Sequence, residues 1–325
     1  MIEIKISSQE ANQRVDKYVR KYLNNAPLSF IYRLFRKKDV KISGHWVSID
    51  YILKTDDVLR IYVTDQQLSE LSKPRELTNA TILKSVVYED ENILIANKIK
   101  GLLVHGDEKE KTNTLANQVI NYLISKGEYN PKETKGFVPA PAHRLDRNTS
   151  GLVIFAKNLP ALQELEAMFK KREGIEKHYL ALVVGCVEKD QLINIPLRKD
   201  AQAKMVKVDK LENGALEAKS KIHVQKRLKK YTLLDVQLLT GRTHQIRVHM
   251  NAIGHPVVCD GKYGDFKDNR LFKETFNYDS QFLHAYLLKF NGNQGVLAYL
   301  NGRTFESPLP EKELEILNVL SNKEN

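Results

Sequence analysis

The sequence predicts an α+β protein in two parts, because helical and strand patterns follow one another without a regular strand–helix alternation. Its 325 residues are enough for two domains. A composition of 42% apolar and 28% charged residues is typical of a chain that builds a sizeable core. A polar, unpatterned segment separates two patterned regions. We therefore expect a small domain at 10–65, a linker at 66–81 and a larger domain at 82–325.

The small domain is predicted to contain two short helices followed by a small sheet. Apolar residues recur at helical spacing over 15–23, and a second helical run follows, with Ser29 as its expected N-cap. Residues 40–49 have the pattern of a hairpin, and 59–63 alternate as a further strand.

The larger domain is predicted to mix strands and helices in no regular order. Apolar runs and alternation predict strands at 86–88, 93–96, 152–156, 179–184 and 231–238. Helical periodicity predicts helices at 115–123, 161–171 and 243–253. This order favours α+β over a doubly wound parallel sheet.

Positive charge is concentrated in the small domain. The formal net charge is +11, and residues 14–64 hold eleven Lys or Arg against five Asp. Four of these cations cluster at the end of the second predicted helix, namely Arg33, Arg36, Lys37 and Lys38. Such an excess favours a polyanionic partner, nucleic acid before an anionic membrane. A second basic stretch at 198–230 fits either a hairpin on a phosphate backbone or a solvated surface.

Several classes of protein are excluded by the sequence. No apolar stretch approaches the roughly 18 residues of a membrane helix, and no signal peptide is visible. Cys186 and Cys259 cannot form a disulfide framework or a CxxC metal site. His244, His249 and His255 lack a second cluster of metal ligands. We therefore expect a cytoplasmic protein with no metal and no membrane partner.

The sharpest local motif is the polar, Gly-terminated turn at 143–151, which leads into an apolar strand. Asp146 stands in this turn between Arg144 and Arg147. Turns that lead into buried strands often carry catalytic side chains, because a rigid element positions them. The alternative is that Asp146 caps the turn by accepting hydrogen bonds from the amides that follow it.

A second motif covers residues 240–249 at the start of a predicted helix. Thr243 is the expected N-cap, which puts Arg247 one turn into the helix. An arginine there favours an ionised carboxylate close by. Alternatively, Arg242 and Arg247 contact phosphates or are surface charges.

A third motif, residues 177–183, opens an apolar strand with Tyr179. Core packing is the default interpretation of such a residue.

Together these stretches resemble the signature of the RluA-type family of RNA pseudouridine synthases. The family pattern HRLDxxTSGxxxxAK is matched at 143–157, KxYxAxxxG at 177–185, and TGRTHQIRVH followed by GHP at 240–256. The NKPxG pattern appears at 97–101 without its proline, which we expect to alter loop rigidity. The late HAxxLxF pattern is present at 284–290.

Residues 10–63 resemble an S4 RNA-binding domain, the usual N-terminal attachment in family members that act on large-subunit ribosomal RNA. Residues 30–37 and 260–265 are most similar to the C-type branch, which acts on bacterial 23S rRNA. The resemblance implies a catalytic domain built on a mixed, mostly antiparallel sheet with flanking helices. It also implies cofactor-free isomerisation of uridine in 23S rRNA or a pre-50S particle, with a monomer as the default state.

The resemblance further implies a role for each site residue. Asp146 is the essential catalytic aspartate, Arg247 is its arginine partner, and Tyr179 stacks on the target base. The target base must be flipped out of folded RNA, and Arg144 fills the gap that it leaves. RNA binding is assigned to Arg144 together with Arg33, Arg36, Lys37, Lys38 and Arg242.

Three alternatives remain open from the sequence. The first is the same chemistry on another RNA such as tRNA, and the second is a non-catalytic RNA-binding or ribosome-assembly factor. The third, ranked last, is a carboxylate-dependent nucleoside hydrolase, which would need a second placed acid. The identity of the uridines, the choice between free rRNA and particle, and the order of steps at Asp146 stay open as well.

Overall fold

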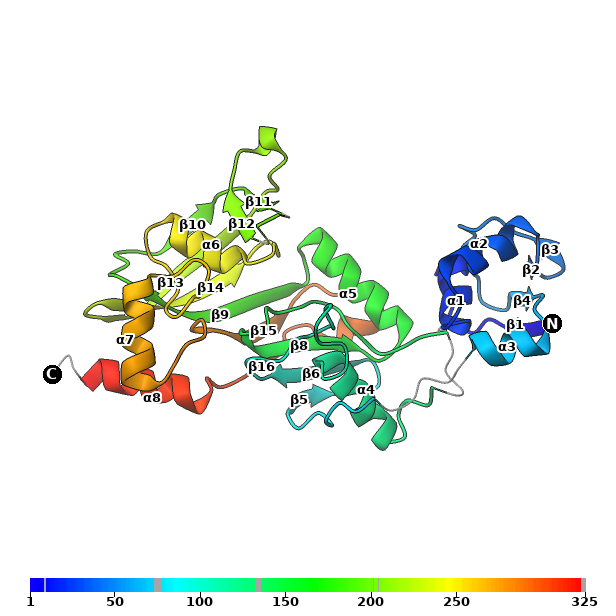
Figure 1. Cartoon of the computed structure of the whole chain (residues 1–325), viewed down its shortest axis with the longest axis horizontal. Coiled ribbons are helices and arrows are strands. Elements are labelled where there is room, and N and C mark those ends of the chain that lie inside the picture. Colours follow the sequence, from blue (N-terminus) through cyan, green and yellow to red (C-terminus); the bar gives the residue numbers. More distant parts are fainter. Residues whose placement is uncertain (9, 73–77, 132–135, 201, 204, 323–325) are drawn as a thin grey trace.

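The computed structural model of the chain has an α+β fold with a small N-terminal sheet and a large mixed sheet, as the sequence predicts (Figure 1). The small N-terminal unit lies at one end, and the C-terminal helices lie at the other. The structure describes residues 1–8, 10–72, 78–131, 136–200, 202–203 and 205–322.

The N-terminal unit packs two helices on a four-stranded antiparallel sheet with strand order β1-β4-β2-β3. Its elements are β1 Ile2–Lys5, α1 Val15–Tyr22, α2 Leu28–Arg36, β2 Val40–Ile42, β3 His45–Trp46 and β4 Val58–Ile61. Strand β1 precedes the expected start at residue 10, and pairs with β4 from Ile2 opposite Ile61. The expected N-cap at Ser29 is wrong. Helix α2 begins at Leu28 after Pro27, whose fixed φ of −65° suits the entry to a helix.

The first half of the expected linker is a helix, which corrects the interpretation of this segment as unpatterned. Helix α3 (Asp65–Leu71) begins with a capping box in which Thr64 and Gln67 exchange side-chain and backbone hydrogen bonds. Leu68 and Leu71 pack against the core of the N-terminal unit. Residues 73–77 of the expected linker lie outside the described residues. The three domain boundaries stay a prediction.

The large sheet has the strand order β10-β13-β14-β9-β15-β8-β6-β5, with β16 beside β15 and β7 beside β8. Its pairs are antiparallel except for β15 with β8, which is parallel. The strands are β5 Val86–Glu89, β6 Ile93–Lys98, β7 Ala140–Pro141, β8 Ser150–Ala156, β9 Ile175–Val184, β10 Gln191–Asn194, β13 Lys219–Leu228, β14 Tyr231–Leu238, β15 Leu283–Phe290 and β16 Thr304–Glu306.

Helices cover both faces of this sheet. They are α4 Leu115–Ser125, α5 Leu159–Lys171, α6 Gln245–Ala252, α7 Phe266–Phe276 and α8 Glu311–Asn322, with 3-10 turns at Leu211–Asn213 and Gly295–Leu300. A separate hairpin is formed by β11 (Leu197–Asp200) and β12 (Met205–Val208). No helix in the described part of the chain is both long and apolar enough to cross a membrane.

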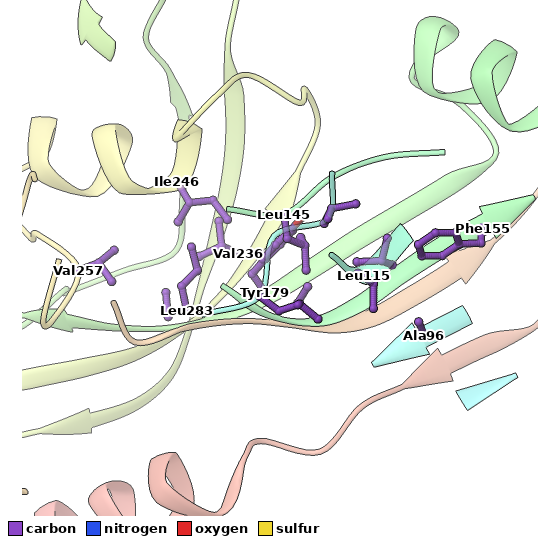
Figure 2. Close-up of a cluster of buried hydrophobic side chains, with 14 of the residues drawn as sticks. Ala96, Leu115, Leu145, Phe155, Tyr179, Val236, Ile246, Val257 and Leu283 are labelled. Atoms are coloured by element: carbon purple, nitrogen blue, oxygen red, sulfur yellow. The ribbon is translucent and has the colours of Figure 1, made fainter. Parts of the chain in front are cut away.

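Strands β6 and β8 are buried on both faces, which explains the uninterrupted apolar runs at 93–96 and 152–156. Alternate side chains point to opposite sides of a strand. Val153 and Phe155 therefore join the core under α4 and α6, part of which is drawn in Figure 2. Leu152 and Ile154 join a second core under α5.

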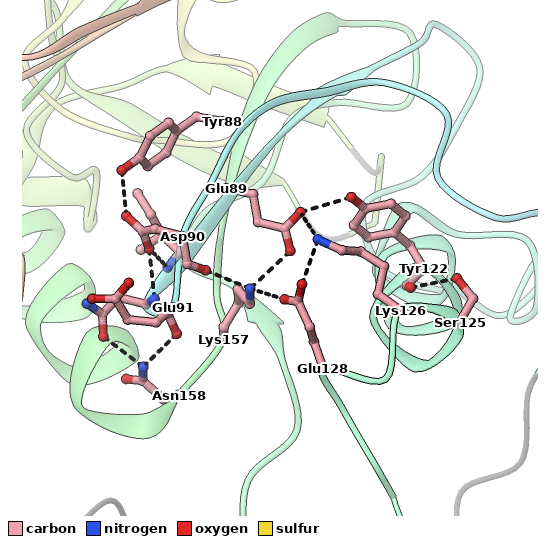
Figure 3. Close-up of polar contacts among 12 residues, drawn as sticks. Tyr88, Glu89, Asp90, Glu91, Tyr122, Ser125, Lys126, Glu128, Lys157 and Asn158 are labelled. Atoms are coloured by element: carbon pink, nitrogen blue, oxygen red, sulfur yellow. Dashed lines mark hydrogen bonds and ion pairs between the residues drawn. The ribbon is translucent and has the colours of Figure 1, made fainter.

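Lys157, the last residue of the family pattern at 143–157, is a structural cation. Its ammonium donates to the carboxylates of Glu89 and Glu128 and to the carbonyl of Asp90 (Figure 3). The side chain is 10% exposed, so these partners compensate a largely buried charge. Lys157 thereby ties the end of β5 and the segment after α4 to the end of β8.

Gly151 lies where β8 and β15 come into parallel register, and its φ of +110° is one that glycine adopts readily. A Cβ at this position would lie 2.1 Å from the carbonyl oxygen of Ala285.

We expect Gly151→Ala to lower the free energy of unfolding by more than about 3 kcal/mol, measured by urea denaturation. The control is Gly292→Ala, because Gly292 has φ +72° with open space around it. Its strain alone should cost about 1–2 kcal/mol. Equal losses in the two variants would contradict the steric argument.

Candidate active site

The three motifs meet at one cleft of about 630 Å³. Its walls come from the turn before β8, from β9 and from the segment that leads into α6. The charged and aromatic lining includes Arg144, Asp146, Lys177, Tyr179, Arg242 and Arg247. Segments that are about 100 residues apart in sequence thus form a single concave surface, the usual setting of a ligand site.

Asp146 faces Arg247 across this cleft. The Nη1 of Arg247 donates to the Oδ2 of Asp146 at 2.9 Å, and the Asp146 side chain is 25% exposed. In the described part of the chain, neither Asn148 nor Thr149 donates an amide hydrogen bond to this carboxylate, so capping of the turn does not explain its position. The amide of Thr149 instead donates to the backbone oxygen of Asp146. The Oδ1 of Asp146 makes no hydrogen bond among the described residues, and Asp146 is part of the cleft lining.

A second carboxylate, Asp260, holds Arg247 from behind. The arginine Nε and Nη2 donate to the two oxygens of Asp260 at 2.6 and 2.8 Å, a bidentate pair with Asp260 fully buried. Burial raises the pKa of Asp260, but hydrogen bonds from Arg247 and from the amides of Lys262 and Tyr263 outweigh it, so this pKa lies below its ordinary value. Both acids therefore fix the orientation of one guanidinium.

The start of α6 differs from the prediction because His244, not Thr243, is the N-cap. His244 has a φ of +53° and no capping side-chain bond. The side chain of Gln245 instead fixes the segment before the helix, since its Oε1 accepts from the Thr240 hydroxyl at 2.7 Å and from the Arg242 amide at 3.0 Å. This rigid turn brings the ring of His244 beside the cleft.

The ring of His244 lies between Tyr263 and Asp146. The Tyr263 hydroxyl accepts from the Val206 amide at 2.9 Å and lies 2.9 Å from the Nδ1 of His244. The Nε2 of His244 lies 3.9 Å from the Oδ2 of Asp146. Burial lowers the pKa of His244, which favours a neutral ring beside the carboxylate.

Tyr179 is part of both the core and the cleft wall. On β9 it lies between Val236 of β14 and Ala285 of β15, and it packs in the same cluster as Leu145 and Leu283 (Figure 2). Burial raises the pKa of Tyr179, so the ring stays a neutral phenol. The expectation of core packing therefore agrees with its position, and the same ring also faces the cleft.

Two lysines near the site belong to the motifs, although the sequence assigns them no role. The ammonium of Lys98 is buried and donates to the carbonyls of Leu102 at 2.7 Å and Arg147 at 2.9 Å. Burial lowers the pKa of Lys98 to about 7, against the attraction of Asp146. Lys177 lines the cleft 4.8 Å from the centroid of the Phe169 ring, and burial lowers its pKa to about 8. Their presence in the motifs is the only sequence signal that singles them out.

The missing proline of the motif at 97–101 is accompanied by an anchored lysine. The ammonium of Lys100 lies 2.6 Å from the Glu313 carboxylate and donates to the Tyr278 hydroxyl and the Gln281 carbonyl. Glu313 belongs to α8 and is buried. The loop that follows Lys98 at the end of β6 is thus fixed by the side chain of Lys100 instead of by a proline ring.

The expected RNA-binding residues fall into two places. Arg144 and Arg242 line the cleft, and the Nε of Arg242 donates to the carbonyl of Glu217 at 2.9 Å. The remaining four lie in the N-terminal unit, on α2 or directly after it, and all are exposed or partly exposed. They are Arg33, Arg36, Lys37 and Lys38.

Within the described residues, no three His, Cys, Asp or Glu side chains gather so as to hold a metal ion. The three histidines that are close in sequence have separate partners. His249 is bonded to Ser220 and the Ile195 carbonyl, whereas His255 is bonded to the Val184 carbonyl.

Comparison with known proteins identifies the family. The sequence model of the RNA pseudouridylate synthase family matches residues 92–252. Ribosomal large subunit pseudouridine synthase C of Escherichia coli (strain K12) is 32% identical over 326 residues, which cover 98% of this chain and 96% of that protein. The Vibrio cholerae protein of the same name is 32% identical over 297 residues, 88% of each chain.

Solved structures agree at the level of the fold. Human RNA Pseudouridylate Synthase Domain Containing 4 superimposes with a TM-score of 0.57 at 21% identity, covering 73% of this chain and 92% of that one. Three motifs that converge on one cleft, a shared fold and about one-third identity over nearly the whole length therefore lead to one conclusion. The chain belongs to the RNA pseudouridine synthase family, whose members are isomerases.

Proposed function

We propose that this protein converts uridine to pseudouridine in 23S ribosomal RNA, with Asp146 as the catalytic residue. The observation that carries the proposal is the Asp146 carboxylate in the cleft lining, which accepts a hydrogen bond from Arg247 on one oxygen and has no hydrogen-bond partner on the other among the described residues. The large-subunit target is supported by the relatives, which are named as large subunit pseudouridine synthases and match this chain over most of its length.

The reaction conserves atoms and electrons within the nucleotide. The N1–C1′ bond breaks, C5 of the uracil bonds to the same C1′, the C5 proton leaves, and N1 takes up a proton. Asp146 has three available routes: attack on the sugar, attack on the base, or removal of the C2′ proton. Each route needs an ionised carboxylate in a partly desolvated cleft, and the guanidinium of Arg247 donates a hydrogen bond to the carboxylate of Asp146.

The other cleft residues have proposed roles that follow from their chemistry. The aromatic ring of Tyr179 offers a surface for the flipped uracil. Arg144 is exposed at the cleft, and its planar guanidinium can stack where the base has left the RNA. Arg242 and Lys177 add positive charge for the neighbouring phosphates.

The N-terminal unit is proposed to supply affinity for the RNA, as an S4 domain would. Its cations at the end of α2 are accessible, and none of the four forms an ion pair with a carboxylate in the described part of the chain. Free 23S rRNA and an assembling ribosomal particle both offer phosphates to this surface. The same chemistry on tRNA, and binding without catalysis, are the competing functions.

We expect Asp146→Asn to abolish tritium release from 23S rRNA transcript labelled at C5 of uridine, with a loss of at least about 10²–10⁴-fold. The substitution keeps the shape of the side chain but removes the charge that every route requires. RNA affinity, measured by filter binding, should stay within about twofold of the unmodified protein.

A matched control for this experiment is Asp279→Asn, which makes the same change at an exposed acid paired with Lys273. It should leave tritium release unaltered. Release by the Asp146 variant at the normal rate would contradict its assigned role. If the unaltered protein binds tightly but releases tritium from neither free rRNA nor immature particles, it is not a 23S rRNA synthase.

Asp260→Asn should disable the site without touching the substrate. The buried guanidinium of Arg247 would lose the buried one of its two charged partners, and breaking a buried ion pair costs up to about 3–5 kcal/mol of folding free energy. We expect thermal unfolding to shift down and tritium release to fall by at least about tenfold at a temperature where the variant is fully folded. Unchanged catalysis would show that the position of Arg247 does not depend on Asp260.

A triple variant in which Arg36, Lys37 and Lys38 are each replaced by Gln should bind rRNA more weakly. The log–log slope of affinity against salt concentration should become shallower by about one for each phosphate that the variant no longer neutralises. Lys5→Gln with Arg60→Gln is the control, because these cations of the same unit are already paired with Asp56 and Glu3. An unchanged slope in the triple variant would show that these three cations of the N-terminal unit do not contact RNA phosphates.

A further inference from the structure

A groove of about 610 Å³ lies on the surface of the N-terminal unit, apart from the catalytic cleft. It runs between α2 and the segment that contains β3 and the residues after it, and both elements lie together in Figure 1. Its lining includes Tyr32 and Arg36 from one side, and Trp46 and Ile49 from the other. No part of the proposed uridine chemistry uses this groove.

Two aromatic side chains are unusually open in this groove. Tyr32 is 48% exposed and Trp46 is 58% exposed. Large aromatic rings normally bury much of their area, and open rings on a basic surface are typical of platforms for unpaired bases. Trp46 is also the one tryptophan in the sequence.

The positive charge around the groove is not compensated by carboxylates. Among the described residues, Arg36, Lys38 and Lys41 form no ion pair, whereas Lys5 and Arg60 of the same unit are paired with acids. The ammonium of Lys38 lies 5.0 Å from the centroid of the Trp46 ring. A phosphate held by Lys38 would therefore bring its own base next to the indole.

We propose that this groove binds an unpaired RNA nucleotide, with its base stacked on Trp46 and Tyr32 and its phosphates on Arg36 and Lys38. The ligand class follows from the combination of open aromatic rings with free cations, because a duplex offers phosphates but no exposed base faces. The inference rests on the proposed function in one respect, namely that the polyanionic partner is RNA.

The groove would give the N-terminal unit a preference for single-stranded segments of the target. Phosphate contacts alone do not distinguish a duplex from a loop. A stacking site does, since only an unpaired base presents its face to a side chain. The N-terminal unit would then bind a single-stranded loop of the RNA and hold that RNA where the cleft can act on a nearby uridine.

Trp46 itself provides the readout. The intact protein is titrated with single-stranded hexauridylate and, separately, with an abasic hexamer of the same ribose-phosphate backbone, and the indole emission is followed. We expect hexauridylate to quench the emission and the abasic hexamer to bind without quenching it. Equal quenching by both, or binding of hexauridylate with no quenching, would overturn the proposal.

Substitution of Tyr32, the second aromatic ring of the groove, tests the same site by a change in affinity and leaves Trp46 intact. Tyr32→Leu should weaken hexauridylate binding about tenfold, the effect of removing one base–aromatic stack, and leave abasic affinity unchanged. The control is Tyr62→Leu, an exposed ring of the same unit that lies outside the groove lining and beside Lys41. Equal weakening in both variants, or weakening toward the abasic hexamer as well, would contradict the proposal.

The two proposals fail separately. Tritium release without quenching of Trp46 would reject the nucleotide-binding groove and support the synthase activity. Quenching by hexauridylate without tritium release from any rRNA substrate would support the groove and reject the proposed 23S rRNA activity.

Discussion

The guanidinium of Arg247 is the group on which the geometry of the site depends. It lies between a fully buried carboxylate, Asp260, and a partly exposed one, Asp146, and it donates hydrogen bonds to both. A buried arginine is stable only when its charge and its donors are compensated. Asp260 provides this compensation in a bidentate pair, so Arg247 has one fixed position from which it can orient Asp146.

The three charges of this group do not cancel. By formal charge, two carboxylates and one guanidinium leave one negative charge within this group, whereas the surrounding cleft is lined by the cations Arg144, Lys177 and Arg242. Lys98 and the neutral ring of His244 lie around this charge, and neither forms a direct hydrogen bond with it. On the proposed function, a carboxylate oxygen with no hydrogen-bond partner among the described residues, the Oδ1 of Asp146, suits a group that must attack or accept a proton.

Local sequence patterns predict much of the fold and part of the site. The strands in 152–156 and 231–238 and the helix in 161–171 are predictable because one buried face or one buried run imposes a period on the sequence. The motif at 143–151 singles out Asp146 because a charged residue in a rigid turn before a buried strand is locally unusual.

The features that the sequence does not reveal depend on contacts between distant segments or on local caps. Asp260 reads as an ordinary turn residue, and its role appears only when the chain brings it against Arg247. Lys98 is an ordinary cation until folding surrounds it with backbone carbonyls. Helix α3 escapes prediction for a different reason, since its Thr64–Gln67 capping box is visible but its seven residues show little periodicity.

RNA affinity requires accessible, unpaired cations, whereas the chemistry at Asp146 requires cations in fixed positions. The chain carries the two kinds of cation in different units. Most arginines near the cleft are already engaged, since Arg172 pairs with Glu217, Arg242 donates to a carbonyl and Arg247 is held by two acids. Cations so fixed give precise positions but few free contacts for a long polyanion. The cations after α2 are accessible and unpaired in the described structure, so they can follow a phosphate backbone without breaking ion pairs. On the proposed function, a synthase that must find its target uridine in ribosomal RNA therefore gains from carrying its free charge on a separate unit, where strong electrostatic attraction does not disturb the charges around Asp146.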